Sequence, residues 1–73
     1  MPLRNHLRRL RFEAGELTQQ QLAERVGVTR QTILSIEKGK YRPSVELALL
    51  LARELGVTVE QLFELGGTEG AER

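Results

Sequence analysis

Apolar residues recur along the chain at helical spacing, with short polar segments between them. Leu3, Leu7, Leu10 and Ala14 fall at intervals of three and four, which places them on one face of a helix that Gly15 ends. No stretch alternates apolar and polar residues as a half-buried strand does. The pattern therefore predicts an all-α fold without strands.

A repeated local pattern marks the starts of the later helices. Three threonines each follow an apolar residue and precede another by four positions, as N-cap residues inside a hydrophobic staple do: Thr18, Thr29 and Thr58. Gln21 and Gln61 complete two capping boxes, and Ser44 predicts a fourth N-cap. Three glycines stand where helices should stop: Gly27, Gly39 and Gly56. The signals together predict five helices, at about 3–14, 19–26, 30–38, 45–55 and 59–64.

Length and composition narrow the class of protein. A chain of 73 residues makes one small domain, which we expect over residues 1–65 with a flexible tail at 66–73. There is no Cys, no Asp and a single His, so thiolate zinc sites, disulfides and a Ser-His-Asp triad are excluded. We expect no enzyme, no metal and no cofactor. The longest apolar run spans six residues, 47–52, so we expect a cytoplasmic protein without a membrane partner.

Charge is divided unevenly along the chain. Residues 1–42 hold nine Lys and Arg against four Glu, whereas residues 43–73 hold two Arg against six Glu. A basic first part and an acidic second part indicate a polyanionic partner on one side of the domain. In a domain this small, the same division also arises by chance.

Two short predicted helices on either side of Gly27-Val28-Thr29 have helix-turn-helix spacing. The segment 18–33 (TQQQLAERVGVTRQTI), followed by IEKGKYRPS at 36–44 and LGVT at 55–58, resembles the Xre/Cro-like helix-turn-helix regulators. The likeness covers residues 3 to about 63. It implies a five-helix, lambda-repressor-like domain that binds specific double-stranded DNA, usually as a dimer. We therefore expect the protein to be nucleoid-associated when bound to DNA.

The third predicted helix has one apolar and one polar side. Ile33 and Ile36 belong on the core side, and Gln31 and Ser35 on the other. Gln can bond adenine and Arg guanine through two hydrogen bonds in the major groove. With the resemblance, four residues become candidate base contacts: Arg30, Gln31, Thr32 and Ser35. We expect Leu34, on the same side, to be an exposed or interface residue.

The candidate backbone contacts surround this helix. Three cations and a phenol hydroxyl lie around Gly39, which is typical of a clamp on the DNA backbone, although a solvated basic loop has the same composition. The resemblance adds Gln19, whose side chain and backbone amide would meet a phosphate. The candidate phosphate contacts are Gln19, Thr29, Lys38, Lys40, Tyr41 and Arg42. We expect three cations of the first helix to be surface charges only: Arg4, Arg8 and Arg9.

One charged pair has a structural interpretation. Glu37 falls on the apolar side of its helix and needs a partner there. The resemblance supplies Arg11, which would fix the third helix against the first. His6 lies on the polar side of the first predicted helix, where we expect it to be solvated.

Several apolar residues have no place in the predicted core, namely Phe12, Leu34, Leu50, Phe63 and Leu65. We expect a homodimer built from the fourth and fifth helices and the residues up to Leu65. The function that fits best is a repressor on a pseudo-palindromic operator. Two alternatives are an antitoxin-type module with a protein partner as well as DNA, and a DNA binder with little sequence preference.

Overall fold

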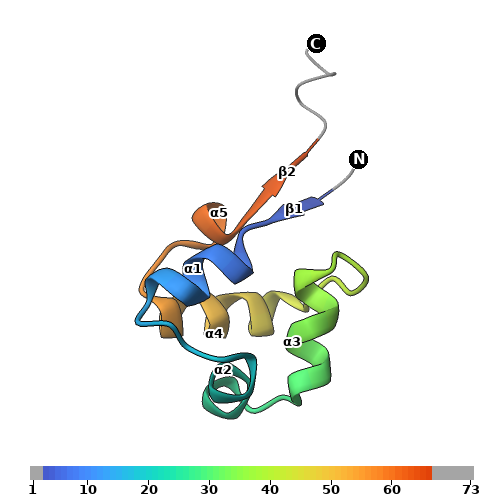
Figure 1. Cartoon of the computed structure of the whole chain (residues 1–73). Helices are drawn as coiled ribbons and strands as arrows, with labels where there is room; N and C mark the ends of the chain where they lie inside the picture. The colour runs from blue at the N-terminus through green and yellow to red at the C-terminus, as the bar shows by residue number, and fades with distance from the viewer. Residues whose placement is uncertain (1–2, 67–73) are drawn as a thin grey trace.

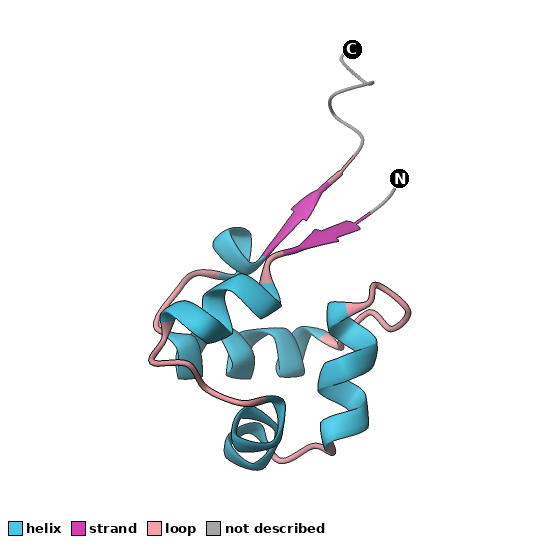
Figure 2. Cartoon of the chain, viewed as in Figure 1, coloured by secondary structure: helices cyan, strands magenta, loops and turns pink. Residues whose placement is uncertain are grey.

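The computed structural model describes residues 3–66, which form five helices and one small antiparallel sheet (Figures 1 and 2). In chain order the elements are β1 (Leu3–Asn5), α1 (Leu7–Glu13), α2 (Gln19–Val26), α3 (Arg30–Glu37), α4 (Val45–Leu55), α5 (Val59–Leu62) and β2 (Phe63–Leu65). The five predicted helices are confirmed. Most of the expected flexible tail, residues 67–73, lies outside the described residues.

The predicted starts of α2, α3, α4 and α5 are confirmed by a hydrogen bond at each of their N-caps. Thr18 accepts the backbone N–H of Gln21 at 3.0 Å, and the Gln21 side chain accepts the Thr18 N–H at 2.9 Å. Thr58 and Gln61 form the same capping box at the start of α5. The Thr29 and Ser44 side chains cap α3 and α4. Each cap satisfies a backbone donor that has no partner inside its helix.

The expectation that the chain has no strands is wrong. β1 and β2 pair in antiparallel register, Leu3 opposite Leu65 and Asn5 opposite Phe63, and they lie side by side beyond the helices in Figure 1. The helix expected at 3–14 therefore begins only at Leu7, and the helix expected at 59–64 ends at Leu62. The Asn5 side chain explains the first boundary, because its Nδ2 donates to the Ile36 carbonyl at 3.0 Å and its Oδ1 accepts the Leu7 N–H at 3.4 Å.

The expectation that His6 is merely solvated is also wrong. His6 occupies the junction between β1 and α1, where its backbone N–H donates to the Leu62 carbonyl at 2.8 Å. Its side-chain Nε2 lies 2.7 Å from Oε1 of Glu64 on the paired strand. This hydrogen bond holds the pKa of Glu64 below its ordinary value of 4.5. The two contacts join the first helix to the end of the described chain.

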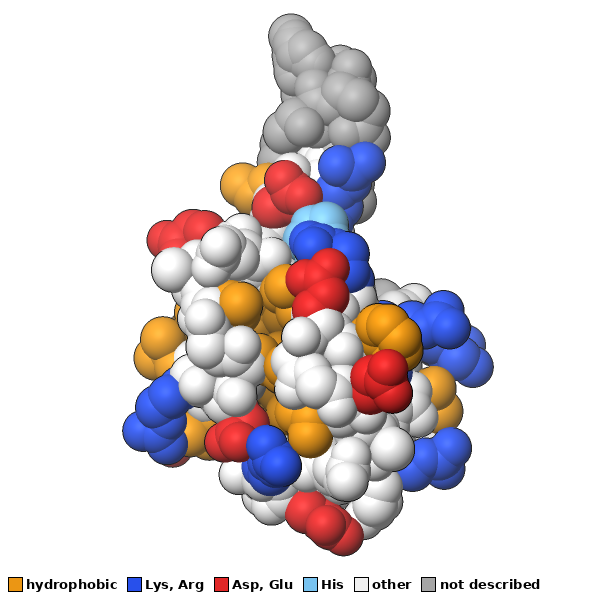
Figure 3. Space-filling view, turned by 60° about the vertical axis from the view of Figure 1, so that its left-hand side comes forward, with side chains coloured by type: hydrophobic (Ala, Val, Ile, Leu, Met, Phe, Trp, Pro, Cys, Tyr) orange, Lys and Arg blue, Asp and Glu red, His pale blue; other side chains and the backbone are white. Residues whose placement is uncertain are grey.

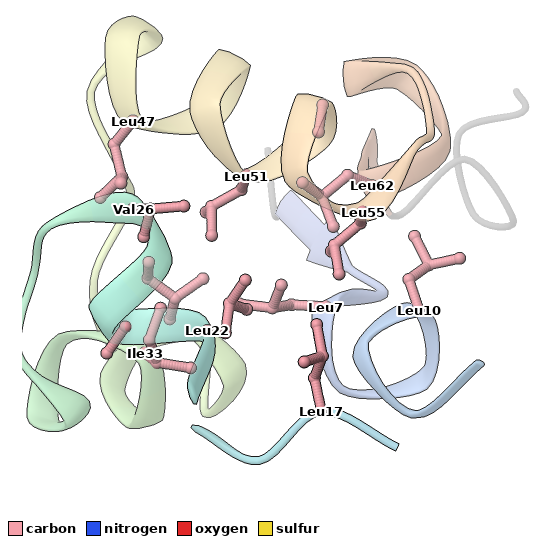
Figure 4. Close-up of a cluster of buried hydrophobic side chains, with 13 residues drawn as sticks. Leu7, Leu10, Leu17, Leu22, Val26, Ile33, Leu47, Leu51, Leu55 and Leu62 are labelled. Atoms are coloured by element: carbon pink, nitrogen blue, oxygen red, sulfur yellow. The ribbon is translucent and has the colours of Figure 1, made fainter. Parts of the chain in front are cut away.

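The core lies between α4 and the first three helices. The largest fully buried side chains are Leu7, Leu22, Ile33, Ile36, Leu51 and Leu62. Figure 4 shows Leu7, Leu22 and Leu51 pointing toward one another from three different helices. The predicted core face of the third helix, Ile33 and Ile36, is confirmed.

The outer face of α4 differs from the expected one. Leu50, expected to be exposed, is half-buried and packs against the core, as does Phe63 on β2. The exposed apolar residues of α4 are instead Val45, at 78%, and Leu49, at 56%. They lie four residues apart and so share one helix face. Phe12 and Leu65 are exposed as expected.

Candidate nucleic-acid interface

Helices α2 and α3 are joined by the predicted turn. Gly27 has a φ of 78°, in the left-handed region that suits glycine, and ends α2. Val28 packs against the core, and Thr29 begins α3 by accepting the Thr32 N–H at 3.2 Å. Gly27 at the end of α2 and Thr29 at the start of α3 thus set the angle between the two helices.

Helix α3 presents its polar side to solvent because its apolar side is buried. Ile33 is fully buried and Ile36 is 1% exposed. Arg30 and Gln31, in the first turn, are exposed, while Ser35 is half-buried. α3 has no acidic residue in its first turn, so the positive end of its dipole is not offset there. An exposed, polar helix face of this kind can enter the major groove of DNA.

The predicted base-contact residues differ in how their side chains are bonded. Gln31 Nε2 lies 3.4 Å from Ser35 Oγ, a long and weak contact. Thr32 Oγ1 lies 3.1 Å from Thr29 Oγ1. Within residues 3–66, Arg30 forms no ion pair and no side-chain hydrogen bond. Of the four predicted base-contact residues, Arg30 and Gln31 therefore lose the least hydrogen bonding within the protein when their side chains turn toward a bound molecule.

The loop after α3 keeps its cations exposed. Lys38, Lys40, Tyr41 and Arg42 are all exposed, with Gly39 at a φ of 75° between the two lysines. The loop is fixed to the end of α3, because Lys40 N–H donates to the Ser35 carbonyl at 2.9 Å. None of these three cations pairs with a carboxylate among the described residues. The loop therefore holds positive charge at a defined place beside α3.

The Arg11 and Glu37 side chains form an ion pair beneath this surface. Arg11 Nε donates to Glu37 Oε2 at 2.7 Å, and Nη2 donates to Oε1 at 3.2 Å. The third nitrogen, Nη1, donates to the Leu17 carbonyl at 2.6 Å. The Glu37 side chain is 6% exposed and that of Arg11 is 14% exposed. The pair joins α1 to α3 and to the segment that leads into α2.

The side chain of Gln19 joins the same network, which the sequence did not indicate. Gln19 Nε2 donates to Glu37 Oε1 at 3.0 Å. One of the two hydrogens on the amide nitrogen is thereby used, and the other remains. The structure thus brings three predicted site residues, Arg11, Gln19 and Glu37, into one cluster.

The described part of the molecule separates its charges in space. Arg30 and the loop cations lie on and beside α3, whereas Glu46, Glu54 and Glu60 lie on α4 and α5. In Figure 3, several blue side chains lie along the right-hand edge, whereas the blue ones at the top and lower left stand near red ones. One edge of the domain is therefore suited to a polyanion.

Among residues 3–66, no helix is long and apolar enough to cross a membrane. No group of three or more potential metal-binding side chains occurs in the same range.

Known proteins resemble this chain in sequence over most of its length. A sequence model of the helix-turn-helix family matches residues 7–62. An uncharacterized HTH-type transcriptional regulator of Methanothermobacter thermautotrophicus is 55% identical over 64 residues, which cover 86% of this chain and 91% of that protein.

Solved structures resemble its fold. The restriction-modification controller protein C.AhdI of Aeromonas hydrophila superposes with a TM-score of 0.69 at 33% identity, over 75% of this chain and 78% of that one. The clp gene regulator ClgR of Corynebacterium glutamicum gives a TM-score of 0.68 at 32% identity over 73% of this chain. The aligned part is 55% of the ClgR chain.

Proposed function

Because the chain belongs to the Xre/Cro-like helix-turn-helix family of DNA-binding transcriptional regulators, we propose that it represses transcription by occupying a pseudo-palindromic operator as a homodimer. The observation that carries the proposal is the exposed polar side of α3, whose opposite side is buried in the core. The relatives' description as transcriptional regulators supports this function over a toxin-neutralising one.

The proposed reader of the base sequence is the outer side of α3. Arg30 would bond a guanine at O6 and N7, and Gln31 an adenine at N6 and N7. The long Gln31–Ser35 contact costs little to exchange for a base. Thr32 and Ser35, further along the helix, would contact the neighbouring bases.

The proposed backbone contacts come from both sides of α3. The remaining amide hydrogen of Gln19 and its backbone N–H, in the first turn of α2, would meet one phosphate. Thr29 would contact the backbone at the start of α3. Beyond the end of α3 the contacts would be those of the exposed loop: Lys38, Lys40, Tyr41 and Arg42. These residues position the helix and carry little sequence information.

A homodimer is proposed because apolar side chains stay exposed on α4 and β2. Val45 and Leu49 on α4 and Leu65 on β2 are each more than half exposed. A two-fold dimer places two α3 helices about 34 Å apart, one turn of the DNA duplex. The operator would then contain two related half-sites.

The first experiment is selection of bound duplexes from a random pool by the full chain, followed by sequencing. It gives the preferred half-site and the spacing together. Gln31→Ala is then expected to cost about 1–3 kcal/mol on the selected duplex and to relax the choice of one base pair. Lys40→Ala should weaken binding to the selected and the scrambled duplex alike. It should also reduce the slope of log affinity against log salt concentration by about one unit.

Binding curves for both variants, on both duplexes and at several salt concentrations, decide the matter. Equal loss of affinity on both duplexes for Gln31→Ala would contradict base reading by α3. General DNA binding would then remain as the function.

A further inference from the structure

A shallow depression of about 330 Å³ lies where α1, the start of α2 and the second half of α3 meet. It is lined by Arg8, Arg11, Gln19, Leu34, Glu37 and Lys38. Two of these residues, Gln19 and Lys38, are backbone contacts in the function proposed above. Arg8 is the member of the group to which the charge pattern gave no role beyond the solvated surface.

We infer that Arg8 is a further contact to the DNA backbone, binding a phosphate next to the one at the start of α2. The inference rests on the proposed function, because the ligand is the phosphodiester of the same bound duplex. It adds α1 to the two helices from which the proposed phosphate contacts come.

The position of Arg8 is fixed by contacts on both sides of it in the chain. Three residues before it, Asn5 donates to the Ile36 carbonyl at 3.0 Å. Three residues after it, Arg11 pairs with Glu37 at 2.7 Å. Arg8 and Arg11 share one face of α1, because residues three apart in a helix are neighbours. Arg8 therefore stands over the end of α3.

The charges of the depression favour an anion. Glu37 is neutralised by Arg11 and also accepts a hydrogen bond from Gln19. Among residues 3–66, neither Arg8 nor Lys38 forms an ion pair. Two exposed cations thus border the same depression without a carboxylate to offset them, and a guanidinium can hold two phosphate oxygens at once.

The neighbouring Arg9 provides a matched control on the same helix. Arg9 carries the same charge, but it pairs with Glu13 at 3.4 Å and does not line this depression. Both arginines are exposed, so neither Arg8→Ala nor Arg9→Ala should change the melting temperature by more than a degree or two, in keeping with roughly ±0.5 kcal/mol for surface substitutions.

The test measures affinity against salt concentration for the full chain on the selected duplex and on a scrambled duplex of equal length. Arg8→Ala should weaken binding to both roughly three- to tenfold and reduce the slope of log affinity against log salt by about 0.9. Arg9→Ala should leave the slope unchanged. Arg8→Lys should recover most of the slope, since it restores the charge.

Single methylphosphonates, which remove one backbone charge at a time, then locate the contact. With the wild-type protein, one substituted position beside the Gln19 phosphate should weaken binding. With Arg8→Ala the same substitution should have no further effect.

The outcomes separate the two proposals. If the wild type prefers the selected duplex and Arg8→Ala and Arg9→Ala change the slope equally, the Arg8 contact is wrong and the proposed function stands. If the wild type shows no preference for the selected duplex, sequence-specific repression is wrong. The salt slopes of Arg8→Ala and Arg9→Ala then still decide whether Arg8 binds the DNA backbone.

Discussion

Glu16, in the turn between α1 and α2, has a backbone conformation that residues other than glycine rarely adopt. Its φ is 59°, and it follows Gly15 at 97°. An L-residue in the left-handed region costs about 1–2 kcal/mol of folding free energy. Glycine removes this strain, but it also gives the unfolded chain more conformational freedom, which offsets part of the gain in stability. Glu16→Gly is therefore expected to stabilise the fold by about 0.5–1 kcal/mol, measured by thermal or urea unfolding.

Glu13→Gly is the matched control for this prediction. Glu13 is also an exposed glutamate, but it ends α1 in helical conformation, so glycine there should cost up to about 1 kcal/mol. Destabilisation of similar size by both substitutions would show that Glu16 is not strained.

The ion pair of Arg11 and Glu37 gives the largest predicted effect of a single residue. Glu37→Ala leaves the Arg11 charge without its carboxylate at a site where both side chains are mostly buried. The cost is expected to be about 3–5 kcal/mol, a large part of the stability of a domain this small. Replacing both residues by Met should be milder, because no charge is then left without a partner.

Unfolding curves of these variants are compared with those of Glu54→Ala. Glu54 pairs with Arg25 at 3.3 Å, but both side chains are far more exposed, so its loss should cost less than about 1 kcal/mol. A Glu37→Ala protein that melts within a few degrees of the wild type would rule out the structural role of the pair.

Residues of the site could be found from the sequence only in part. Helical periodicity placed Glu37 on the core side of α3, but only the family resemblance supplied Arg11 as its partner. The bond from Gln19 to Glu37 left no signal, because it joins residues 18 apart and depends on the angle between α2 and α3. The depression beside Arg8 left no signal for the same kind of reason, since residues of three helices form it.

At the scale of elements, the sequence predicted those helix bounds that depend on interactions between residues close together in the chain. The bounds of α2 and α4 agree with those expected, because Thr18 and Ser44 cap their starts and Gly27 and Gly56 end them. The strands were missed because their ladder joins segments at opposite ends of the described chain. Leu3 also continues the apolar spacing of α1, so the sequence predicted a first helical turn where the extended strand β1 lies.

The link between His6 and Glu64 makes the pairing of β1 and β2 depend on pH. Because the pKa of Glu64 is lowered in the folded protein, its contribution to stability is complete above the unfolded value near 4.5 and is lost as pH falls through the lower folded value. Glu64→Gln removes this contribution. The difference in melting temperature between wild type and Glu64→Gln should shrink as pH is lowered from about 5 to about 3.

Glu60→Gln, on the neighbouring α5, is the control for this titration. Glu60 forms no ion pair with the residues described. A wild-type advantage over Glu64→Gln that persists at the acid end would contradict the role of the carboxylate.

At the scale of the whole molecule, the prediction concerns self-association. Leu49→Glu places a charge in the exposed apolar face of α4 and should turn the proposed dimer into a monomer at micromolar concentration. Phe12→Glu is the control, because Phe12 is 62% exposed on α1, outside the proposed interface. Sedimentation equilibrium distinguishes the two species. A wild type that is monomeric both alone and on DNA would refute the dimer.

The pairing of β1 with β2 nearly closes the described chain into a ring. Leu3 and Leu65 are opposite each other in register, so a few glycines suffice to join them. If the ring is opened between Gly15 and Glu16, every helix stays whole and the chain becomes a circular permutant. Contacts that now connect distant parts of the sequence, such as His6 with Glu64, become local, which shortens the loop to be closed and should speed folding. The same geometry allows residues 3–65 to be inserted into an exposed loop of a host protein, because Leu3 and Leu65 lie opposite each other.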